Sequence, residues 1–383
     1  MIALLLILCL ASIWFYCYGI YAGLTFFKYP YPFDAVFHPD VTILKPVCGN
    51  DGNLYENLAT FCRQDYPNFQ IIFSVRHQDT GISIIEQIIH DFPELDIQLV
   101  VCDRIIGTNL KVSNLANAAV YAKHSILVLA DSDVRVGSDY LERIIQPFQN
   151  QNVGVVTCLY RSSAQGWVTI IEALRQTTEF STGVLVSNKL EGGIKYAFGQ
   201  TIVIRKQVLT AIGGFEAIAD YLADDFQLGY LPAQAGYRVL LSDYVVEHEL
   251  STSNLFDAIK QQIRWACCIR VSRSWGYLGL IFTYGIPTSL LLVAFTGGSI
   301  LSWVVLLVTW VTRLVMAWVV GVTCLKDPLV RKYLWFVPLC DLFGFIIWCY
   351  CFVSNNIEWR GQKLKLAKDG KMIVNAQKLR MVN

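Results

Sequence analysis

The stretch SILVLADSD, residues 125–133, decides the fold class of this chain. A short apolar run that ends in Asp and Ser is typical of a buried strand followed by a turn. Similar segments alternate along the same part of the chain, with strands at 41–44, 70–75 and 97–101 and helical spacing at 53–63, 81–91 and 113–122. Short strands alternating with helices of about 10 to 12 residues predict an α/β domain with a parallel sheet covered on both faces.

Polar side chains are concentrated where the predicted strands end. In open parallel sheets, ligands bind beyond the carboxyl ends of the strands. The residues at these ends are Lys45, Pro46, 76–79, Asp103, Asp131 and Asp133. We therefore expect the ligand site along this edge of the sheet.

Asp131 and Asp133 form a D-x-D loop directly after the strand at 125–130. A hard divalent cation prefers carboxylate and phosphate oxygens, and it can bridge a diphosphate and neutralise the charge of a leaving group. The loop therefore predicts a site for Mg²⁺ or Mn²⁺ on Asp131 and Asp133, with Asp131 also facing a nucleotide. The alternative is a solvated turn, because Asp and Ser are common in turns.

The composition indicates a membrane protein with a soluble part. Of the 383 residues, 54% are hydrophobic and 16% are charged, whereas soluble domains average about 25% charged residues. The net charge of +1 gives no basic excess and argues against nucleic acid as a partner. The twelve cysteines include no C-x-x-C pair, so we expect them to be reduced and to act mostly as apolar side chains facing cytosol or lipid.

Hydrophobicity divides the chain into four regions. Residues 1–27 are long enough for an uncleaved membrane anchor, since about 20 apolar residues span a bilayer. Residues 28–274 have the composition of one globular domain, and 354–383 form a basic tail. Between them, 275–353 is a membrane region of apolar blocks at 275–294, 299–324 and 333–353.

Basic residues beside the apolar blocks predict an outside N-terminus and a cytoplasmic soluble domain. Three crossings after that domain would put the basic tail outside, so one block is expected not to be a simple crossing. Our candidate is 275–294, because glycines and Pro287 interrupt it. Within 299–324, Arg313 either pairs with a residue such as Asp341 or contacts a lipid head group.

Two further sites at the sheet edge suit a nucleotide. Lys111 and Asn114 open a helix after a loop, so a cation and a helix N-terminus would face the nucleotide or its phosphates. The alternative is a plain helix start capped by Ser113. Asp79 follows the second strand and could bind the base or ribose, or could cap the helix at 81–91.

Asp224 and Asp225 are adjacent carboxylates at an expected loop or helix start. One of two adjacent, partly buried carboxylates has a raised pKa, which suits a general base near neutral pH. Asp225 is therefore the candidate base for an acceptor hydroxyl. An acidic helix start, favoured by the helix dipole, is the alternative.

The segment 261–265 reads Gln-Gln-Ile-Arg-Trp, a Q-x-x-R-W box. On a helix, Gln261, Arg264 and Trp265 lie on neighbouring faces, where Arg can bind a diphosphate and Trp can stack on a sugar or base. An interfacial helix with a Trp and Arg belt is the alternative, and both can hold. His248, between the two motifs, could be a metal ligand, but a hydrogen-bonded loop histidine is favoured.

These motifs together resemble the family 2-type and family 21-type glycosyltransferases of the GT-A fold. The likeness is greatest to the ceramide glucosyltransferases and their bacterial relatives, including hopanoid-associated lipid glycosyltransferases. It rests on Leu44–Val47, Lys111–Leu115, Asp131–Val136, Gly213–Phe215, Asp220–Phe226, the Q-x-x-R-W box and Glu358–Gly361.

The resemblance implies a Rossmann-like nucleotide-diphospho-sugar transferase domain and inverting transfer from a UDP-sugar to a lipid. It implies that Asp131 and Asp133 serve nucleotide and metal, that Asp225 is the base, and that the Q-x-x-R-W box acts on diphosphate or acceptor. Two points depart from the family pattern. The acidic pair is Asp-Asp where Glu-Asp is commoner, and the upstream acidic signature is either Asp96 or Asp103.

The leading hypothesis is a membrane-bound glycosyltransferase that moves glucose from UDP-glucose to ceramide, in glycolipid biosynthesis. Hopanoid or diacylglycerol acceptors are alternatives, as is a processive polysaccharide synthase, which shares the motifs but needs more membrane crossings for its pore. A silent transporter or scaffold is a different class, and it would not need an aspartate at position 225.

Overall fold

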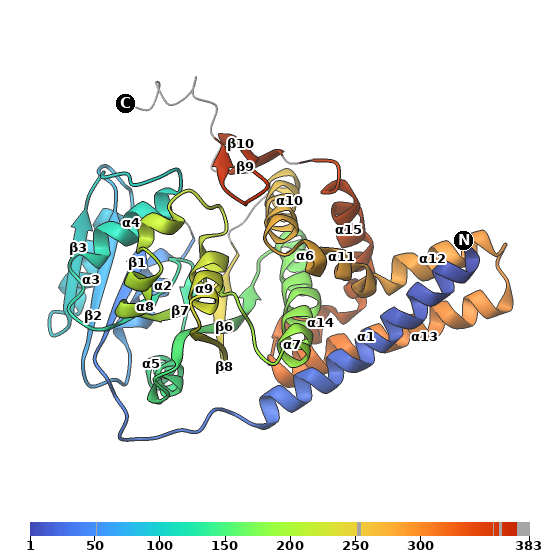
Figure 1. The fold of residues 1–383 in the computed structure, drawn as a ribbon, viewed down its shortest axis with the longest axis horizontal. Coiled ribbons are helices and arrows are strands. Elements are labelled where there is room, and N and C mark those ends of the chain that lie inside the picture. Colours follow the sequence, from blue (N-terminus) through green and yellow to red (C-terminus); the bar gives the residue numbers. More distant parts are fainter. Residues whose placement is uncertain (51, 251–253, 355, 360–361, 374–383) are drawn as a thin grey trace. The chain divides into compact units, whose positions relative to one another are not determined.

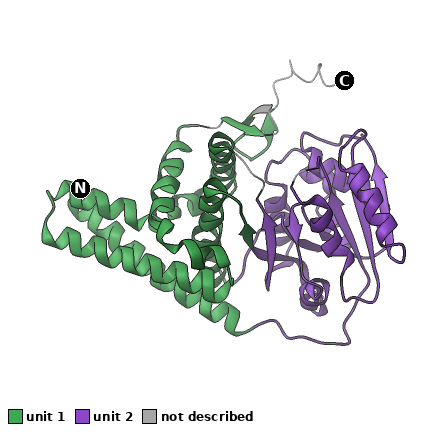
Figure 2. Cartoon of the chain, turned by 180° about the vertical axis from the view of Figure 1, so that it is seen from behind, with its two compact units in different colours: residues 1–29, 161–192, 252–383 green, residues 30–160, 193–251 purple. Residues whose placement is uncertain are grey.

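The computed structural model describes residues 1–50, 52–250, 254–354, 356–359 and 362–373. Arg360 and Gly361 of the late motif, and residues 374–383 of the predicted tail, lie outside this set. The chain forms two compact units (Figure 2). The sheet unit consists of residues 30–160 and 193–251, and the helical unit consists of 1–29, 161–192 and 252–383.

The sheet unit is built on eight strands in the order β3-β2-β1-β4-β7-β6-β8-β5 (Figure 1). The four predicted strands lie side by side and are parallel: β3 (Asp96–Val101), β2 (Phe69–Val75), β1 (Val41–Pro46) and β4 (Ile126–Leu129). Every residue of β1, β2 and β4 is buried. Burial on both faces explains why these strands are continuous apolar runs in the sequence.

The rest of the sheet departs from the predicted parallel arrangement. β7 (Ile202–Arg205) is antiparallel to β4 and to β6 (Val153–Ser163), and β5 (Val134–Arg135) is antiparallel to β8 (Arg238–Glu249). Apolar periodicity identifies a strand but carries no information on its direction, which depends on the connections. The α/β class is confirmed, and the sheet is mixed.

Helices follow the parallel strands in the predicted order, with α2 (Leu54–Cys62) after β1, α3 (Ile82–Asp91) after β2 and α4 (Leu110–Ala119) after β3. α4 packs against β1 and β2. The remaining helices of this unit are α5 (Tyr140–Ile145), η1 (Gln146–Gln149), α8 (Lys206–Ala211), η3 (Phe215–Ile218) and α9 (Asp224–Gln234). Because the first four strands are parallel, the loops after them meet at one edge.

Among the described residues, three helical stretches are long and apolar enough to cross a membrane, and all belong to the helical unit. They are α1 (Ile2–Lys28), α13 with η5 (Ile300–Ala317, Trp318–Cys324), and α14 with η6 and α15 (Pro328–Tyr333, Leu334–Phe336, Val337–Tyr350). A fourth stretch is broken: Ser274–Thr283, which contains α11 (Ser274–Gly279) and η4 (Leu280–Thr283), meets α12 (Gly285–Phe295) at 60°. The predicted interruption of block 275–294 is therefore present.

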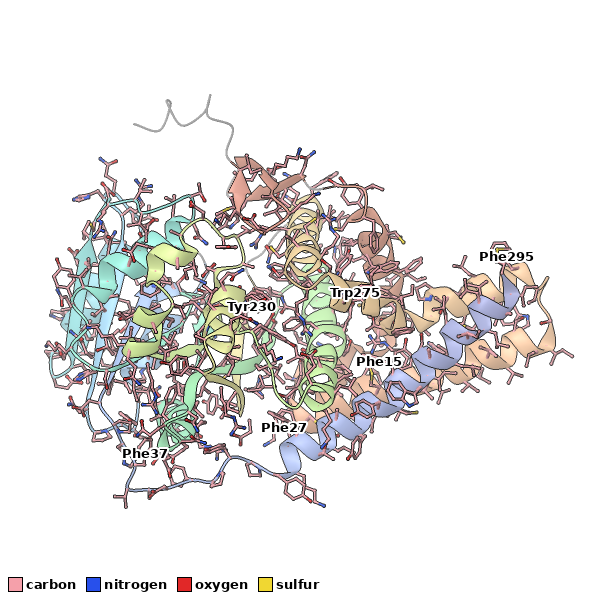
Figure 3. The ribbon with its side chains drawn as sticks, viewed as in Figure 1. Phe15, Phe27, Phe37, Tyr230, Trp275 and Phe295 are labelled. Carbon is pink, nitrogen blue, oxygen red and sulfur yellow. The ribbon has the colours of Figure 1, made fainter. Side chains whose placement is uncertain are left out.

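α12 and α13 form a helical hairpin, and both helices pack against α1. Contacts at two levels fix its direction: Leu5 with Leu292 and Val305, and Ser12 with Gly285 and Thr309. α12 therefore runs antiparallel to α1, whereas α13 runs parallel to it. Figure 3 shows Phe295 near the N-terminus and Phe27 at the opposite end of α1.

Tyr16 stabilises the break before α12. Its hydroxyl donates to the carbonyl oxygen of Thr283 at 2.8 Å and accepts from the amide of Gly285 at 2.9 Å. Backbone groups freed by a break in an apolar region need such partners. A Cβ at Gly285 would lie 2.8 Å from Ser12 and Thr309, so glycine permits the close approach of three helices.

Arg313 pairs with Asp341, which confirms one of its two predicted environments. Arg313 Nε lies 2.9 Å from Asp341 Oδ2 and Nη2 lies 2.8 Å from Oδ1, and both residues are 1% exposed. This bidentate pair joins α13 to α15. Ionisable residues at apolar positions are normally paired in this way.

The compact units divide the chain differently from the predicted domain at 28–274. The helical unit also contains α6 (Trp167–Arg175), the π-helical η2 (Gln176–Phe180), α7 (Ser181–Leu190), α10 (Leu255–Ser272) and the small sheet β9–β11 (Asn356–Trp359, Gln362–Leu366, Met372–Ile373). α7 packs on α1, and α6 and α10 pack on α15. Hydropathy does not detect that these helices belong to the helical unit, because an amphipathic helix buries only one face.

Candidate active site

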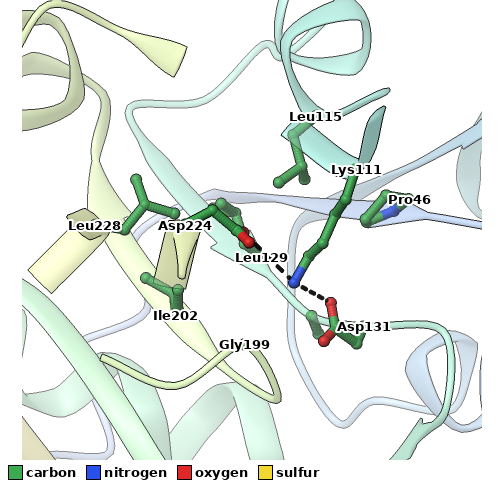
Figure 4. A pocket seen from close by; sticks show the side chains of 10 residues that line it. Pro46, Lys111, Leu115, Leu129, Asp131, Gly199, Ile202, Asp224 and Leu228 are labelled. Atoms are coloured by element: carbon green, nitrogen blue, oxygen red, sulfur yellow. Dashed lines mark ion pairs between the residues drawn. The ribbon is translucent and has the colours of Figure 1, made fainter. Parts of the chain in front are cut away.

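Lys111 and Asp131 form the centre of a charge cluster in the sheet unit (Figure 4). Asp131 follows β4, and Lys111 lies in the first turn of α4. Lys111 Nζ lies 2.6 Å from Asp131 Oδ1 and 3.6 Å from Asp224 Oδ2. Burial disfavours the charge on Lys111, but Asp131, Asp224 and Asp225 outweigh burial and raise its pKa. Lys111 is therefore a fixed cation between the two acidic motifs.

Asn109 holds this arrangement in place. Its Oδ1 accepts from the amides of Lys111 and Val112 at 3.0 and 3.3 Å, and its Nδ2 donates to Asp224 Oδ1 at 3.2 Å. The alternative in which Ser113 caps the helix is wrong, because the cap is Asn109 and the Ser113 hydroxyl donates to the Asn109 carbonyl oxygen inside the helix. One side chain thus connects the start of α4 to the Asp224 carboxylate.

Asp225 lies in the first turn of α9, as expected for a helix start. Its Oδ2 accepts from the amide of Gly199 at 3.1 Å and its Oδ1 from the amide of Phe226 at 2.8 Å. Burial, and then the charge of Asp224, raise the pKa of Asp225 to about 6. A carboxylate with this pKa can accept a proton near neutral pH.

Gly199 brings the two acidic motifs together. Its amide binds Asp225, and a Cβ at this position would lie 2.9 Å from Asp131 Oδ2 and 3.0 Å from Lys111 Nζ. A small cavity of about 10 Å³ is lined by Gly199, Lys111, Asp131 and Asp224 among others. Asp225 and Asp131 are therefore held on either side of one glycine.

Asp133 is the second carboxylate of the D-x-D loop. Its Oδ2 lies 3.3 Å from His248 Nε2, whereas its Oδ1 is buried without a hydrogen-bond partner among the described residues. Burial opposes ionisation of Asp133, but His248, Lys45 and Lys111 outweigh it and keep the pKa low. An ionised carboxylate with a free oxygen suits a hard cation.

The protein alone does not complete a cation site in the part of the chain that the structure describes, where no three His, Cys, Asp or Glu side chains gather around one point. The residues present therefore fit a cation whose remaining ligands come from a bound molecule. His248 lies in β8, not in a loop as expected, and it is 5% exposed with its ring 5.7 Å from that of Tyr160.

Asp79 binds backbone amides at the same edge of the sheet. Its Oδ1 accepts from Gly49 at 3.0 Å and from Gly81 at 2.8 Å. It therefore joins the loop after β1 to the start of α3. Asn114 lies one turn after Lys111 on α4 and is 6% exposed.

Of the two candidates for the upstream acidic signature, Asp103 lies after β3 and Asp96 begins β3. Asp103 accepts from the amide of His77 at 3.0 Å in the loop after β2. Asp96 pairs with Lys123 at the other end of the strand. By position, Asp103 belongs to the edge that carries Asp131, and Asp96 does not.

The Q-x-x-R-W box lies on α10, in the helical unit. Gln261 Nε2 donates to Glu172 Oε1 at 3.0 Å, and Gln262 Oε1 accepts from Arg175 Nη1. The guanidinium of Arg264 lies 6.0 Å from the ring centroid of Trp265. The box is thus on a helix, as its spacing predicts.

The order of these motifs agrees with a match to a known family. The model described as "Glycosyl transferase family 21" matches residues 4–372. The chain belongs to glycosyl transferase family 21.

Curated relatives carry a related name. "Ceramide glucosyltransferase 3" of Caenorhabditis elegans is 24% identical over 230 residues, which are 59% of this chain and 50% of that protein. The ceramide glucosyltransferase of Komagataella phaffii is 36% identical over 110 residues, 27% of this chain and 22% of that protein. The chain thus spans about half the length of the first of these relatives, and less of the second.

A solved structure shows the same fold as this family 21 chain. The mannosyltransferase PcManGT from Pyrobaculum calidifontis, in complex with GDP-Man and Mn²⁺, has a TM-score of 0.55 at 17% identity. The match covers 90% of this chain and 96% of that chain. The predicted GT-A fold with terminal apolar helices is therefore confirmed.

Three further residues of this family 21 chain contribute to the site. Lys45 was expected at this edge of the sheet but without a specific role, and Gly199 and Asn109 were not predicted. Lys45 is 0% exposed, its Nζ donates to the Asp131 carbonyl oxygen at 2.7 Å, and it lies 3.6 Å from the Phe61 ring centroid. Burial lowers the pKa of Lys45 to about 7, against the opposing charges of Asp133 and Asp131. A lysine inside an apolar strand was the signal that could have identified it.

Proposed function

We propose that this chain is a membrane-bound, inverting hexosyltransferase that moves glucose from UDP-glucose to the primary hydroxyl of ceramide. Membership of family 21 and the names of its relatives support the reaction class. The observation that carries the mechanism is Asp225, a half-buried carboxyl with a pKa of about 6 that is bound to Gly199 beside the Lys111 and Asp131 cluster.

We assign the donor end to the edge of the parallel strands. Asp131 and Asp133 would hold Mg²⁺ or Mn²⁺, whose charge offsets that of the leaving diphosphate. The buried Asp133 Oδ1, which has no hydrogen-bond partner among the described residues, supports this assignment. Lys111 keeps Asp131 oriented, and Asp79, Lys111 and Asn114 are the proposed contacts to the nucleotide.

We assign the acceptor step to Asp225. Its carboxylate takes the proton of the lipid hydroxyl while that oxygen forms a bond to the anomeric carbon of the sugar. The bond from the anomeric carbon to the diphosphate breaks at the same time, and UDP leaves with that electron pair. One displacement inverts the anomeric configuration. Gln261, Arg264 and Trp265 are the proposed groups for the diphosphate or the acceptor.

The test is an assay of the full chain in detergent with UDP-[¹⁴C]glucose, ceramide and Mn²⁺. We expect a labelled product that extracts into organic solvent and that mass spectrometry identifies as glucosylceramide. An insoluble polymer would instead indicate a polysaccharide synthase. Transfer to diacylglycerol or a hopanoid supplied in place of ceramide, with none to ceramide, would overturn the acceptor assignment. No transfer from any UDP-sugar, each supplied in place of UDP-glucose, would overturn the proposal.

A further inference from the structure

A groove in the helical unit lies where α1 and α7 end together. It has a volume of about 420 Å³, within the range of small-ligand sites. Its walls are Ala22, Thr25, Phe26 and Tyr29 on one side and Leu185, Asn188, Lys189 and Gly192 on the other. None of these residues has a role in the proposed reaction.

The two helices that form the groove run parallel. A Cβ at Gly19 would meet Thr182, and a Cβ at Gly23 would meet Leu185. The residue numbers of the contacts therefore increase in the same direction along both helices. The groove therefore lies at the end of α1 that carries Lys28. Because α1 is long and apolar enough to cross a membrane, this is the level at which it would leave the apolar layer. A cavity at this level opens to both acyl chains and head groups.

The composition of the groove changes along its length. Ala22 and Leu185 form a buried apolar floor, and Phe26 is half-buried beside them. Thr25 and Asn188 are polar and half-buried, and Lys189 at the rim is exposed. Such a gradient suits a molecule with an apolar chain and a polar head.

The charge at the rim selects the head group. Lys189 Nζ lies 5.3 Å from the ring centroid of Tyr21, and no carboxylate pairs with it among the residues that the structure describes. The nearby Glu191 is paired with Arg273 instead. The rim therefore carries an uncompensated positive charge, to which an anionic group is complementary.

We propose that this groove is a binding site for one anionic phospholipid of the bilayer, with an acyl chain against Ala22, Phe26 and Leu185 and the phosphate at Lys189. Asn188 donates from its side-chain amide to the head group. This site is additional to the donor and acceptor sites, so its failure would leave the proposed transfer reaction untouched.

The test is native mass spectrometry of the full chain released from nanodiscs of phosphatidylcholine with phosphatidylglycerol. We expect one retained phosphatidylglycerol per protein. K189Q should lower its occupancy about fivefold, since one lysine near a membrane surface contributes about that factor. N188W should fill the groove and remove the retained lipid.

K332Q is the matched control, because Lys332 is also exposed and lies 5.0 Å from a tyrosine ring centroid, that of Tyr333, outside the groove. It should retain the lipid fully. If Lys189 only interacted favourably with the C-terminus of α7, K189Q would change the thermal stability of the protein but not its lipid selectivity. Equal retention of phosphatidylcholine, unchanged retention in K189Q and N188W, or displacement by millimolar inorganic phosphate would overturn the proposal.

Discussion

At the scale of single residues, the site depends on how burial and neighbouring charges set each protonation state. Lys111 is kept charged by Asp131 and Asp224, whereas partial desolvation and then the charge of Asp224 raise the pKa of the half-buried Asp225. The same cluster therefore contains a fixed cation and a carboxyl that titrates near neutral pH. This division of roles is what the proposed transfer, with one general base, requires.

Replacing Asp225 by Asn removes the proposed base but keeps the size of the side chain. We expect kcat to fall about a thousandfold, within the usual range for a general base, and KM for UDP-glucose to change little. Steady-state kinetics on the purified chain measure both. Glu216→Gln, an exposed acid before α9, is the control and should be neutral. Equal losses in donor affinity and turnover would argue against the base role.

The pKa of Asp225 predicts an acid limb in the pH dependence of the reaction. The carboxyl must be deprotonated to accept a proton, so kcat/KM should fall about tenfold per pH unit below about 6. A pH–rate profile from about pH 5 to about pH 9 measures this decrease in kcat/KM. The residual activity of Asp225→Asn should lack this limb. A wild-type profile that is flat down to pH 5 would contradict the assignment.

Replacing Asp133 by Ala removes the carboxylate whose Oδ1 has no partner among the described side chains. We expect binding of UDP-glucose to lose its dependence on Mn²⁺. Calorimetric titrations with Mn²⁺ or EDTA measure this, and Asp65→Ala, at an exposed position, should behave as wild type. Wild-type binding that EDTA leaves unchanged would show that the D-x-D loop does not act through a cation.

At the scale of elements, the π-helical η2 connects the Q-x-x-R-W helix to the apolar helices. Glu179 in η2 accepts from Arg175 Nε at 3.0 Å and from the hydroxyl of Tyr284 at 2.8 Å. Arg175 in turn donates to Gln262 on α10. A π-helical turn often occurs at a functional site, because it re-aims side chains that a regular helix would place elsewhere.

Replacing Glu179 by Gln leaves Arg175 buried without its carboxylate. The two side chains are 9% and 11% exposed, so we expect a loss of about 3 kcal/mol in stability. Thermal unfolding in detergent measures the change. Glu191→Gln, which breaks the more exposed pair with Arg273, should cost less than about 1 kcal/mol. Similar costs for both variants would show that η2 does not depend on this pair.

At the scale of the whole molecule, the direction of the apolar helices constrains how the chain enters a membrane. α13 runs parallel to α1 and α12 antiparallel, so the turn before Ser299 lies at the N-terminal end of α1. Lys28 lies at the other end of α1, and Lys326 and Lys332 follow α13 at that same end. The three lysines therefore lie at one end of these helices, which the positive-inside tendency predicts to be the cytoplasmic end.

Glycosylation tags placed at the N-terminus and between Gly297 and Gly298 should therefore be modified together in microsomes. This outcome requires the broken block 275–294 to reach the outer side, in contrast to our expectation that this block is not a simple crossing. A tag inserted after Lys326 should stay unmodified, because we propose that this side is cytoplasmic. The pattern of modified tags, read by mobility shift, is the measurement. Modification of the tag after Lys326 but not of the tag at 297 would reverse the proposed orientation.

The sequence by itself determined the parallel half of the sheet, the D-x-D loop, the helix start at Asp225 and the Arg313–Asp341 pair as one of two options. The first three features are local, since apolar period, turn residues and charge follow directly from neighbouring residues. The pair was one option because an ionisable residue in an apolar segment is normally paired. The tertiary structure alone decided the antiparallel half of the sheet, the assignment of α6, α7 and α10 to the helical unit, and the roles of Lys45, Asn109 and Gly199. Those depend on contacts between residues far apart in the chain, and Gly199 acts only because two side chains from other elements need the space that a Cβ would fill.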